Sequence, residues 1–262
     1  MYKGFDVSLN TLNEEFYHSG KRLFDKIQKS TIQQLDKYIG IDGVINGSDL
    51  EVDWFSEIDS HIFISHSHKD EKLAISLAGY LYEKHGIKCF VDSCIWGYSN
   101  DLLKQIDDKY CRNIHGNTYS YEKRNFSTSH VYMMLSIALN KMIGKCEGFF
   151  LLNSPNSIQT SGIFNETYSP WLYSEIITSK LIEKKTPDRL LNRRTESFSK
   201  GSKEDWINED LKVKYKVTLN HLDKLSQQDI SNWGGMNSDS PENALDILYH
   251  LKKTVHLKLL KI

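Results

Sequence analysis

The stretch 60–93 constrains the fold of this chain more than any other, because it carries a complete strand–turn–helix–strand pattern. A β-branched and aromatic run at 61–65 leads into a polar turn. Apolar residues then recur at helical spacing until Gly86, and a second apolar run at 87–91 ends in Asp92. This order predicts a βαβ unit, the building block of a parallel sheet.

Polar side chains follow both strands of this unit. The first group runs from Ser65 to Asp70 and the second from Asp92 to Tyr98. Ligands of open parallel sheets bind at the carboxyl ends of the strands. The sequence therefore predicts a site at this edge, completed by residues further along the chain.

The rest of the chain continues the alternation of strands and helices. Further strands are expected at 147–152 and 214–219, and helices at 102–110, 129–143, 169–185, 221–230 and 240–255. The predicted fold class is α/β and flavodoxin-like, with a mostly parallel central sheet and helices on both faces. Residues 1–57 are expected to form an N-terminal helical extension. Residues 58–262 are expected to form the main domain, with loops at 156–168 and in an insert near 111–127 and an extended C-terminal part.

Composition narrows the classes of partner. The formal net charge of −1 over 262 residues gives no reason to expect binding to nucleic acid or to an acidic membrane. No apolar run approaches the roughly 18 residues that a membrane-spanning helix needs. The four cysteines lack CxxC spacing, and no signal peptide is recognised, so a reducing, cytoplasmic location is expected.

Motifs for metals and nucleotide cofactors are weak or missing. His61, His66 and His68 lie close together in sequence, but no fourth ligand accompanies them, so no metal is expected. No GxGxxG or GxxxxGK pattern follows any expected strand, which disfavours Rossmann and P-loop cofactor sites.

Three motifs resemble the Toll/interleukin-1 receptor (TIR) domain over roughly residues 58–255. FISHSHKDE is similar to the first strand and turn of that family, and KCFVDS to its second strand, which ends in an acidic residue. Trp171-Leu172-Tyr173-Ser174-Glu175 is similar to the Trp-x-x-x-Glu pattern on a helix of NAD⁺-cleaving TIR domains. The insert and the extensions at both ends are more similar to bacterial antiviral members of the Thoeris type than to animal signalling adaptors.

The resemblance implies an NAD⁺ glycohydrolase or ADP-ribosyl cyclase that uses NAD⁺ as substrate and needs no cofactor. Glu175 would be the catalytic residue. The substrate-binding residues would be Ser65, His66, Ser67, Asp92 and Trp171. Trp96, Tyr98 and His130 would belong to a lid or an interface. The family also implies self-association through TIR–TIR contacts and a downstream effector that senses a nucleotide product in anti-phage defence.

Physical reasoning favours the same residues. Trp171 and Glu175 are four residues apart, which places them on one face of a helix, one turn from each other. Cleavage of the nicotinamide–ribose bond develops an oxocarbenium-like ribose, and one carboxylate that stabilises this positive charge is sufficient in principle.

Other interpretations remain open. A solvated helix residue is the alternative interpretation of Glu175, and Trp171 is typical of a packing residue that also borders the pocket. Ser65 and Ser67 are typical helix caps, and Asp92 is a plausible turn residue. The chain as a whole is also compatible with a non-enzymatic TIR scaffold that acts by homotypic assembly. A third interpretation is an unrelated flavodoxin-like enzyme, such as a nucleoside deoxyribosyltransferase, which also uses one glutamate at a ribosyl centre.

Overall fold

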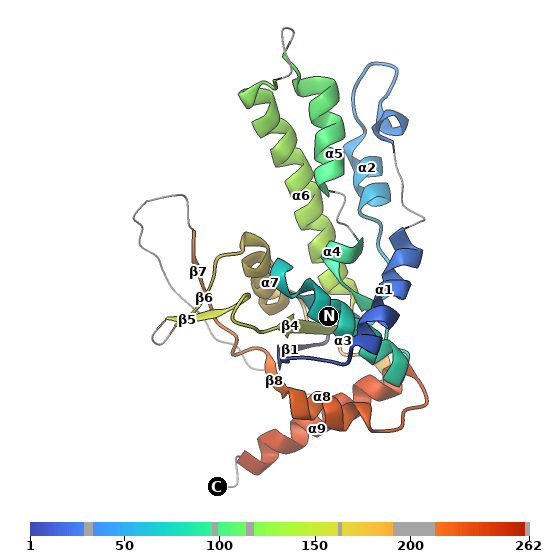
Figure 1. Ribbon diagram of the computed structural model, residues 1–262, viewed down its shortest axis with the longest axis vertical. Coiled ribbons are helices and arrows are strands. Elements are labelled where there is room, and N and C mark those ends of the chain that lie inside the picture. The colour runs from blue at the N-terminus through green and yellow to red at the C-terminus, as the bar shows by residue number, and fades with distance from the viewer. Residues whose placement is uncertain (29–33, 96–98, 114–117, 162–163, 191–212, 260–262) are drawn as a thin grey trace.

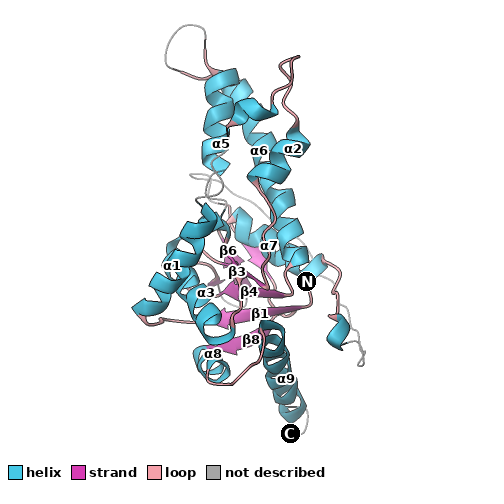
Figure 2. Ribbon diagram, turned by 90° about the vertical axis from the view of Figure 1, so that its right-hand side faces the viewer, coloured by secondary structure: helices cyan, strands magenta, loops and turns pink. Residues whose placement is uncertain are grey.

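The computed structural model describes residues 1–28, 34–95, 99–113, 118–161, 164–190 and 213–259 (Figure 1). In this part of the chain five parallel strands form the central sheet, in the order β3-β2-β4-β1-β8. They are β1 (Lys3–Ser8), β2 (Ile62–Ser65), β3 (Cys89–Phe90), β4 (Gly148–Leu152) and β8 (Asp223–Ser226). Helices lie on both faces of the sheet (Figure 2), so the predicted α/β class is confirmed.

The order of the strands corrects the expectation for the N-terminal region. A flavodoxin-like sheet has the order 2-1-3-4-5, and β3-β2-β4 follow its first three places. The fourth place belongs to β1, which pairs with β4 on one side and with β8 on the other. The prediction that residues 1–57 form a helical extension outside the main domain is therefore wrong, because this region supplies a central strand. Strand β1 leaves no recognisable strand pattern in the sequence, because Gly4 and Asp6 interrupt its apolar residues.

Helices α1 (Glu14–Gln28) and α3 (Glu71–His85) pack together on one face of the sheet (Figure 2). Their backbones touch through two glycines. A Cβ atom on Gly79 would lie 2.0 Å from the carbonyl oxygen of Phe16, and one on Gly20 would lie 2.1 Å from that of Ile75. Helix α3 ends at Gly86 in the left-handed conformation (φ 66°), as the sequence predicts.

The opposite face is covered by α6 (Tyr121–Lys145) and α7 (Pro170–Leu181) (Figure 2). The expected start of α7 is confirmed, because the side chain of Ser169 accepts a hydrogen bond from the backbone N–H of Leu172 and Pro170 occupies the first turn. Helices α8 (Gln227–Gly234) and α9 (Pro241–Leu259) lie near the β8 edge of the sheet.

Part of the structure projects away from the sheet (Figure 1). This projection contains α2 (Gly47–Trp54), α5 (Ser99–Ile106) and the first half of α6. The insert near 111–127 is expected to be a loop, but its first residue, Cys111, ends a π-helical turn (Asp107–Cys111), and α6 already starts within the insert at Tyr121. The buried Asp107 carboxylate joins the π-helical turn to α6, because it accepts hydrogen bonds from the side chains of Arg124 and Ser127 in the first two turns of that helix.

A second, antiparallel sheet contains β5 (Gln159–Ser161), β6 (Phe164–Thr167) and β7 (Tyr215–Val217). The expected loop at 156–168 thus contains strands, and the strand expected at 214–219 pairs with β6 rather than with the central sheet. The fifth central strand, β8, lies where a helix was expected at 221–230. Its only buried residue is Leu225, so it lacks the apolar alternation of a strand.

Four short elements complete the described chain: α4 (Asp92–Ile95) and three 3-10 turns (Leu35–Tyr38, His68–Asp70 and Asp188–Leu190). Among the helices of the described residues, none combines the length and the apolar character needed to cross a membrane.

Candidate functional site

The carboxyl ends of β2 and β3 and one face of α7 meet at one edge of the sheet. Strand β2 ends at Ser65, and Asp92 begins α4 just after β3. Glu175 lies in the second turn of α7, whose start is fixed by Ser169 and Pro170. The fold therefore brings together three residues that the sequence predicted for the site.

Ser65 and Glu175 form the centre of this site. The Ser65 hydroxyl donates a hydrogen bond of 2.6 Å to Oε2 of Glu175. Both residues are almost fully enclosed, with 1% of Ser65 and 4% of Glu175 exposed. The interpretation of Glu175 as a solvated helix residue is therefore wrong, and the Ser65 side chain contacts α7.

The environment of Glu175 favours its protonated form. Burial raises the pKa of the Glu175 carboxyl well above its ordinary value, and the nearby negative charge of Asp92 raises it further. The hydrogen bond from Ser65 acts in the opposite direction, because it stabilises the carboxylate. A positive charge that arrives beside Glu175 would favour the carboxylate for the same electrostatic reason.

The His66 side chain contacts the segment that follows β3. Its Nε2 atom is 3.1 Å from the Ser93 hydroxyl, and its Nδ1 atom is 3.7 Å from Oδ1 of Asp92. The side chain of His66 is 2% exposed, whereas that of Asp92 is 33% exposed. Ser93 was not predicted for the site, since a single serine after a strand has no distinctive pattern.

Trp171 lies on α7 one turn before Glu175 and is partly buried. Its ring meets the ring of Tyr132 on α6 edge to face, with 5.7 Å between the centroids. Trp171 therefore both packs against α6 and lies next to the turn that carries Glu175, as the sequence suggested.

The turn after β2 is held to the loop after β4. Asp70 is buried and accepts hydrogen bonds from the Ser154 hydroxyl and the Asn156 side-chain amide. Ser67 precedes the 3-10 turn His68–Asp70, and its side chain makes no capping hydrogen bond there. Ser67 therefore does not cap the turn. The turn is held instead by the hydrogen bonds from Ser154 and Asn156 to Asp70.

Of the remaining candidate residues, His130 and His61 lie away from this site. Trp96 and Tyr98 lie outside the described residues. His130 is exposed on α6, where its ring meets that of Phe126 at 4.5 Å. His61 lies at the opposite end of β2 and accepts a hydrogen bond from the backbone N–H of Lys88. Within the described residues no cluster of three or more His, Cys, Asp or Glu side chains has the arrangement of a metal site.

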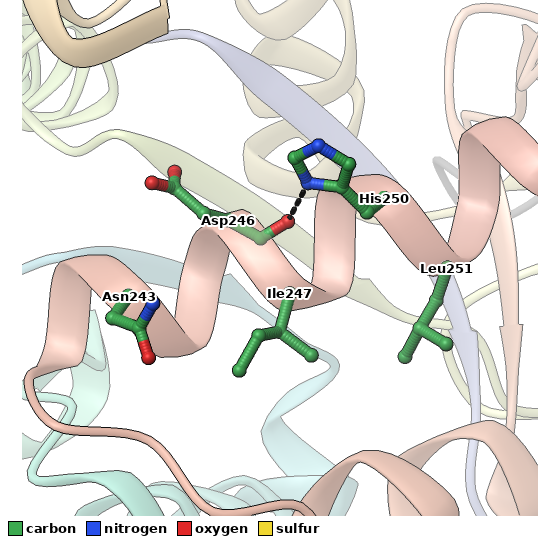
Figure 3. A pocket seen from close by; sticks show the side chains of 5 residues that line it. All are labelled: Asn243, Asp246, Ile247, His250 and Leu251. Atoms are coloured by element: carbon green, nitrogen blue, oxygen red, sulfur yellow. Dashed lines mark hydrogen bonds between the residues drawn. The ribbon is translucent and has the colours of Figure 1, made fainter.

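Two surface hollows lie elsewhere, near the β8 edge of the sheet. One has a volume of about 510 Å³ and is lined by residues of α9 (Figure 3): Asn243, Asp246, Ile247, His250 and Leu251. The other, of about 370 Å³, lies between α8 and α9. Neither hollow is lined by Glu175 or its neighbours, and the side chains in Figure 3 all come from one helix.

In comparisons with known proteins, no family model, no curated protein and no solved structure matches the chain.

Proposed function

We propose that this chain is a TIR-type NAD⁺ nucleosidase or ADP-ribosyl cyclase that cleaves the bond between nicotinamide and ribose. The observation that carries the proposal is the buried Glu175 carboxyl, which is hydrogen-bonded to Ser65 at the carboxyl end of β2. The resemblance of the motifs around Ser65, Asp92 and Glu175 to the TIR family supports the same assignment.

The chemistry needs little more than these groups. As nicotinamide leaves as a neutral molecule, positive charge develops on the ribose, and the Glu175 carboxylate stabilises it. Because the carboxyl is enclosed, its interaction with that charge is weakly screened. Asp92, on the more exposed side of the site, contributes further negative potential and an acceptor for a ribose hydroxyl.

The enclosed site also suits capture of the ribosyl centre by a group other than water. A cyclic or conjugated product forms only if water is excluded from the intermediate. Glu175 is 4% exposed in this structure, so NAD⁺ must enter by displacing side chains that cover it. In the proposed setting the enzyme acts in the bacterial cytoplasm during anti-phage defence, and an effector senses its product.

Incubation of the purified chain with NAD⁺, followed by mass spectrometry of the products, tests the proposal. We expect free nicotinamide together with ADP-ribose or an isomer of cyclic ADP-ribose. Glu175→Gln is expected to abolish the reaction, whereas Glu183→Gln, an exposed carboxylate eight residues later, is expected to keep it. Intact NAD⁺ with the wild-type chain, in the presence of lysate from phage-infected cells as a source of the trigger, would contradict the proposal.

One observation favours a scaffold as the alternative function. Phe126, Met133 and Ile137 share a face of α6 and are 70%, 62% and 43% exposed. Such a face is suited to homotypic contacts. If the chain is a scaffold, Glu175→Gln keeps function in cells, while Met133→Ser together with Phe126→Ser removes it.

A further inference from the structure

The His66 side chain is buried with one nitrogen unsatisfied. Its Nδ1 atom is buried and has no hydrogen-bond partner within the part of the chain that the structure describes. Its Nε2 atom has a partner, the Ser93 hydroxyl at 3.1 Å. Buried polar atoms are nearly always paired, so an unpaired nitrogen at the edge of a site points to an interaction that forms in another state.

Asp92 is the group that this nitrogen faces. Its Oδ1 atom is 3.7 Å from Nδ1, and the two atoms reach an ordinary hydrogen-bond distance of about 2.9 Å after an approach of about 0.8 Å. Asp92 begins the short helix α4, and its side chain is more exposed than that of His66. Of the two groups, the carboxylate is therefore the one with room to move.

We propose that His66 is a positioning residue that holds the Asp92 carboxylate in place when the site is occupied. The Ser93 hydroxyl donates to Nε2, which leaves the ring proton on Nδ1, and Nδ1–H donates to Asp92. The imidazole acts through Asp92 and touches no substrate, unlike the nucleotide contact that the sequence resemblance implies for it. The role of His66 in NAD⁺ cleavage rests on the proposed function. The position of the ring proton on Nδ1 does not depend on it.

The surroundings of His66 support a role that acts on Asp92 rather than on Glu175. Ser65, the residue just before His66, is hydrogen-bonded to Glu175, so the two neighbouring positions at the end of β2 serve the two carboxylates separately. The groups that face the imidazole are Asp92 and Ser93 from the segment after β3. A charge-assisted hydrogen bond to Asp92 would keep that carboxylate at a fixed distance from Glu175.

The first test reads the ring proton directly and needs no enzymatic activity. Nitrogen-15 NMR of the histidine rings, at a pH where His66 is neutral, shows which nitrogen carries the proton, and His66→Gln identifies the signal. We expect the proton on Nδ1 in the wild-type chain and its transfer to Nε2 in Ser93→Ala, which lacks the donor to Nε2. A proton on Nε2 in the wild-type chain, unchanged by Ser93→Ala and Asp92→Ala, would overturn the proposal.

The second test separates the two nitrogens by substitution. The amide nitrogen of Asn occupies the place of Nδ1, and that of Gln occupies the place of Nε2. We expect His66→Asn to keep kcat/KM for NAD⁺ within about threefold, and His66→Gln to lower it about tenfold or more, the usual effect of losing a hydrogen bond to a charged group. Equal losses in both variants would indicate a merely structural role and overturn the proposal.

A double-mutant cycle completes the design. If His66 acts only through Asp92, His66→Gln in an Asp92→Asn background lowers kcat/KM no further, whereas independent effects would multiply. Multiplying effects would overturn the proposal. If the wild-type chain leaves NAD⁺ intact, the proposed function fails, and the NMR test still decides the state of His66.

Discussion

Ser65 and Glu175 are 110 positions apart in sequence, and their side chains are joined by a buried hydrogen bond of 2.6 Å. This bond links the end of strand β2 to the second turn of α7. Within the described residues it is the one hydrogen bond to the Glu175 carboxyl, which burial and Asp92 both push toward the protonated form. The hydroxyl of Ser65 is thus the group that keeps the carboxylate form of Glu175 accessible.

Ser65→Ala tests this relationship through the pH dependence of activity. Loss of the hydroxyl removes the interaction that lowers the pKa of Glu175, so that pKa rises further and the carboxylate forms only at higher pH. We expect kcat/KM for NAD⁺ to fall about tenfold at neutral pH, and the acidic limb of its pH profile to move toward higher pH. Steady-state kinetics across the pH range measures both effects.

The matched control for this variant is Ser76→Ala. Ser76 is also buried, but its hydroxyl donates to the backbone carbonyl of Lys72 within α3, away from the site. Its substitution is expected to leave the pH profile in place. A profile of Ser65→Ala that coincides with that of the wild type would contradict the role given to the hydroxyl.

Glu175 should lower the stability of the fold as the pH rises. The pKa of its carboxyl is higher in the folded than in the unfolded chain, so its favourable contribution is complete below the unfolded pKa and is lost as the pH rises through the folded pKa. Glu175→Gln cannot ionise and avoids this loss. We expect the variant to be more stable than the wild type by about 1–3 kcal/mol at pH 8, with the advantage shrinking toward pH 4.

Urea unfolding of both chains at several pH values measures the difference in free energy of unfolding. Glu183→Gln serves as the control, because Glu183 is exposed and its substitution should not alter the pH dependence. An advantage of Glu175→Gln that stays constant from pH 4 to pH 8 would exclude ionisation of Glu175 as its cause.

The cysteines should be inert in the folded chain. All four are buried, and burial raises the pKa of the Cys94 and Cys146 thiols to about 12. The thiolate is the reactive form, so we expect a thiol reagent at pH 8 to modify the native chain at least about 100-fold more slowly than the chain in 6 M guanidinium chloride. Mass spectrometry of the modified protein measures the rate, and rapid modification of native Cys94 would contradict the prediction.

The sequence predicts those strands whose residues are all buried and apolar or aromatic. Strands β2 and β4 have every residue buried, and apart from Ser65 and Gly148 at their ends, each is a continuous run of apolar or aromatic side chains in the sequence. Strand β1 has Asp6 in its middle and β8 has one buried residue, so neither leaves such a run. These two strands are held by pairing with each other across most of the length of the chain, and a short stretch of sequence does not reveal such a pairing.

The site shows the same division. The spacing of Trp171 and Glu175 and the strand ends at Ser65 and Asp92 are local patterns, and the residues could be chosen from them. That Ser65 bonds to Glu175 while His66 is enclosed beside Ser93 depends on how α7 packs over the sheet, which no local pattern contains.

The close contact between the backbones of α1 and α3 should make Gly79 intolerant of any larger residue. A Cβ atom on Gly79 would lie 2.0 Å from the carbonyl oxygen of Phe16, a backbone atom that cannot rotate away, so Gly79→Ala must push the two helices apart. Overpacking usually costs about 1–3 kcal/mol, and a clash with backbone is expected near the upper end of that range. Thermal unfolding followed by circular dichroism measures the loss. Gly235→Ala is the control, because its nearest neighbour would be 3.5 Å away and its φ of −85° suits any residue. If Gly79→Ala unfolds at the same temperature as Gly235→Ala, the backbones of α1 and α3 are not in contact at Gly79.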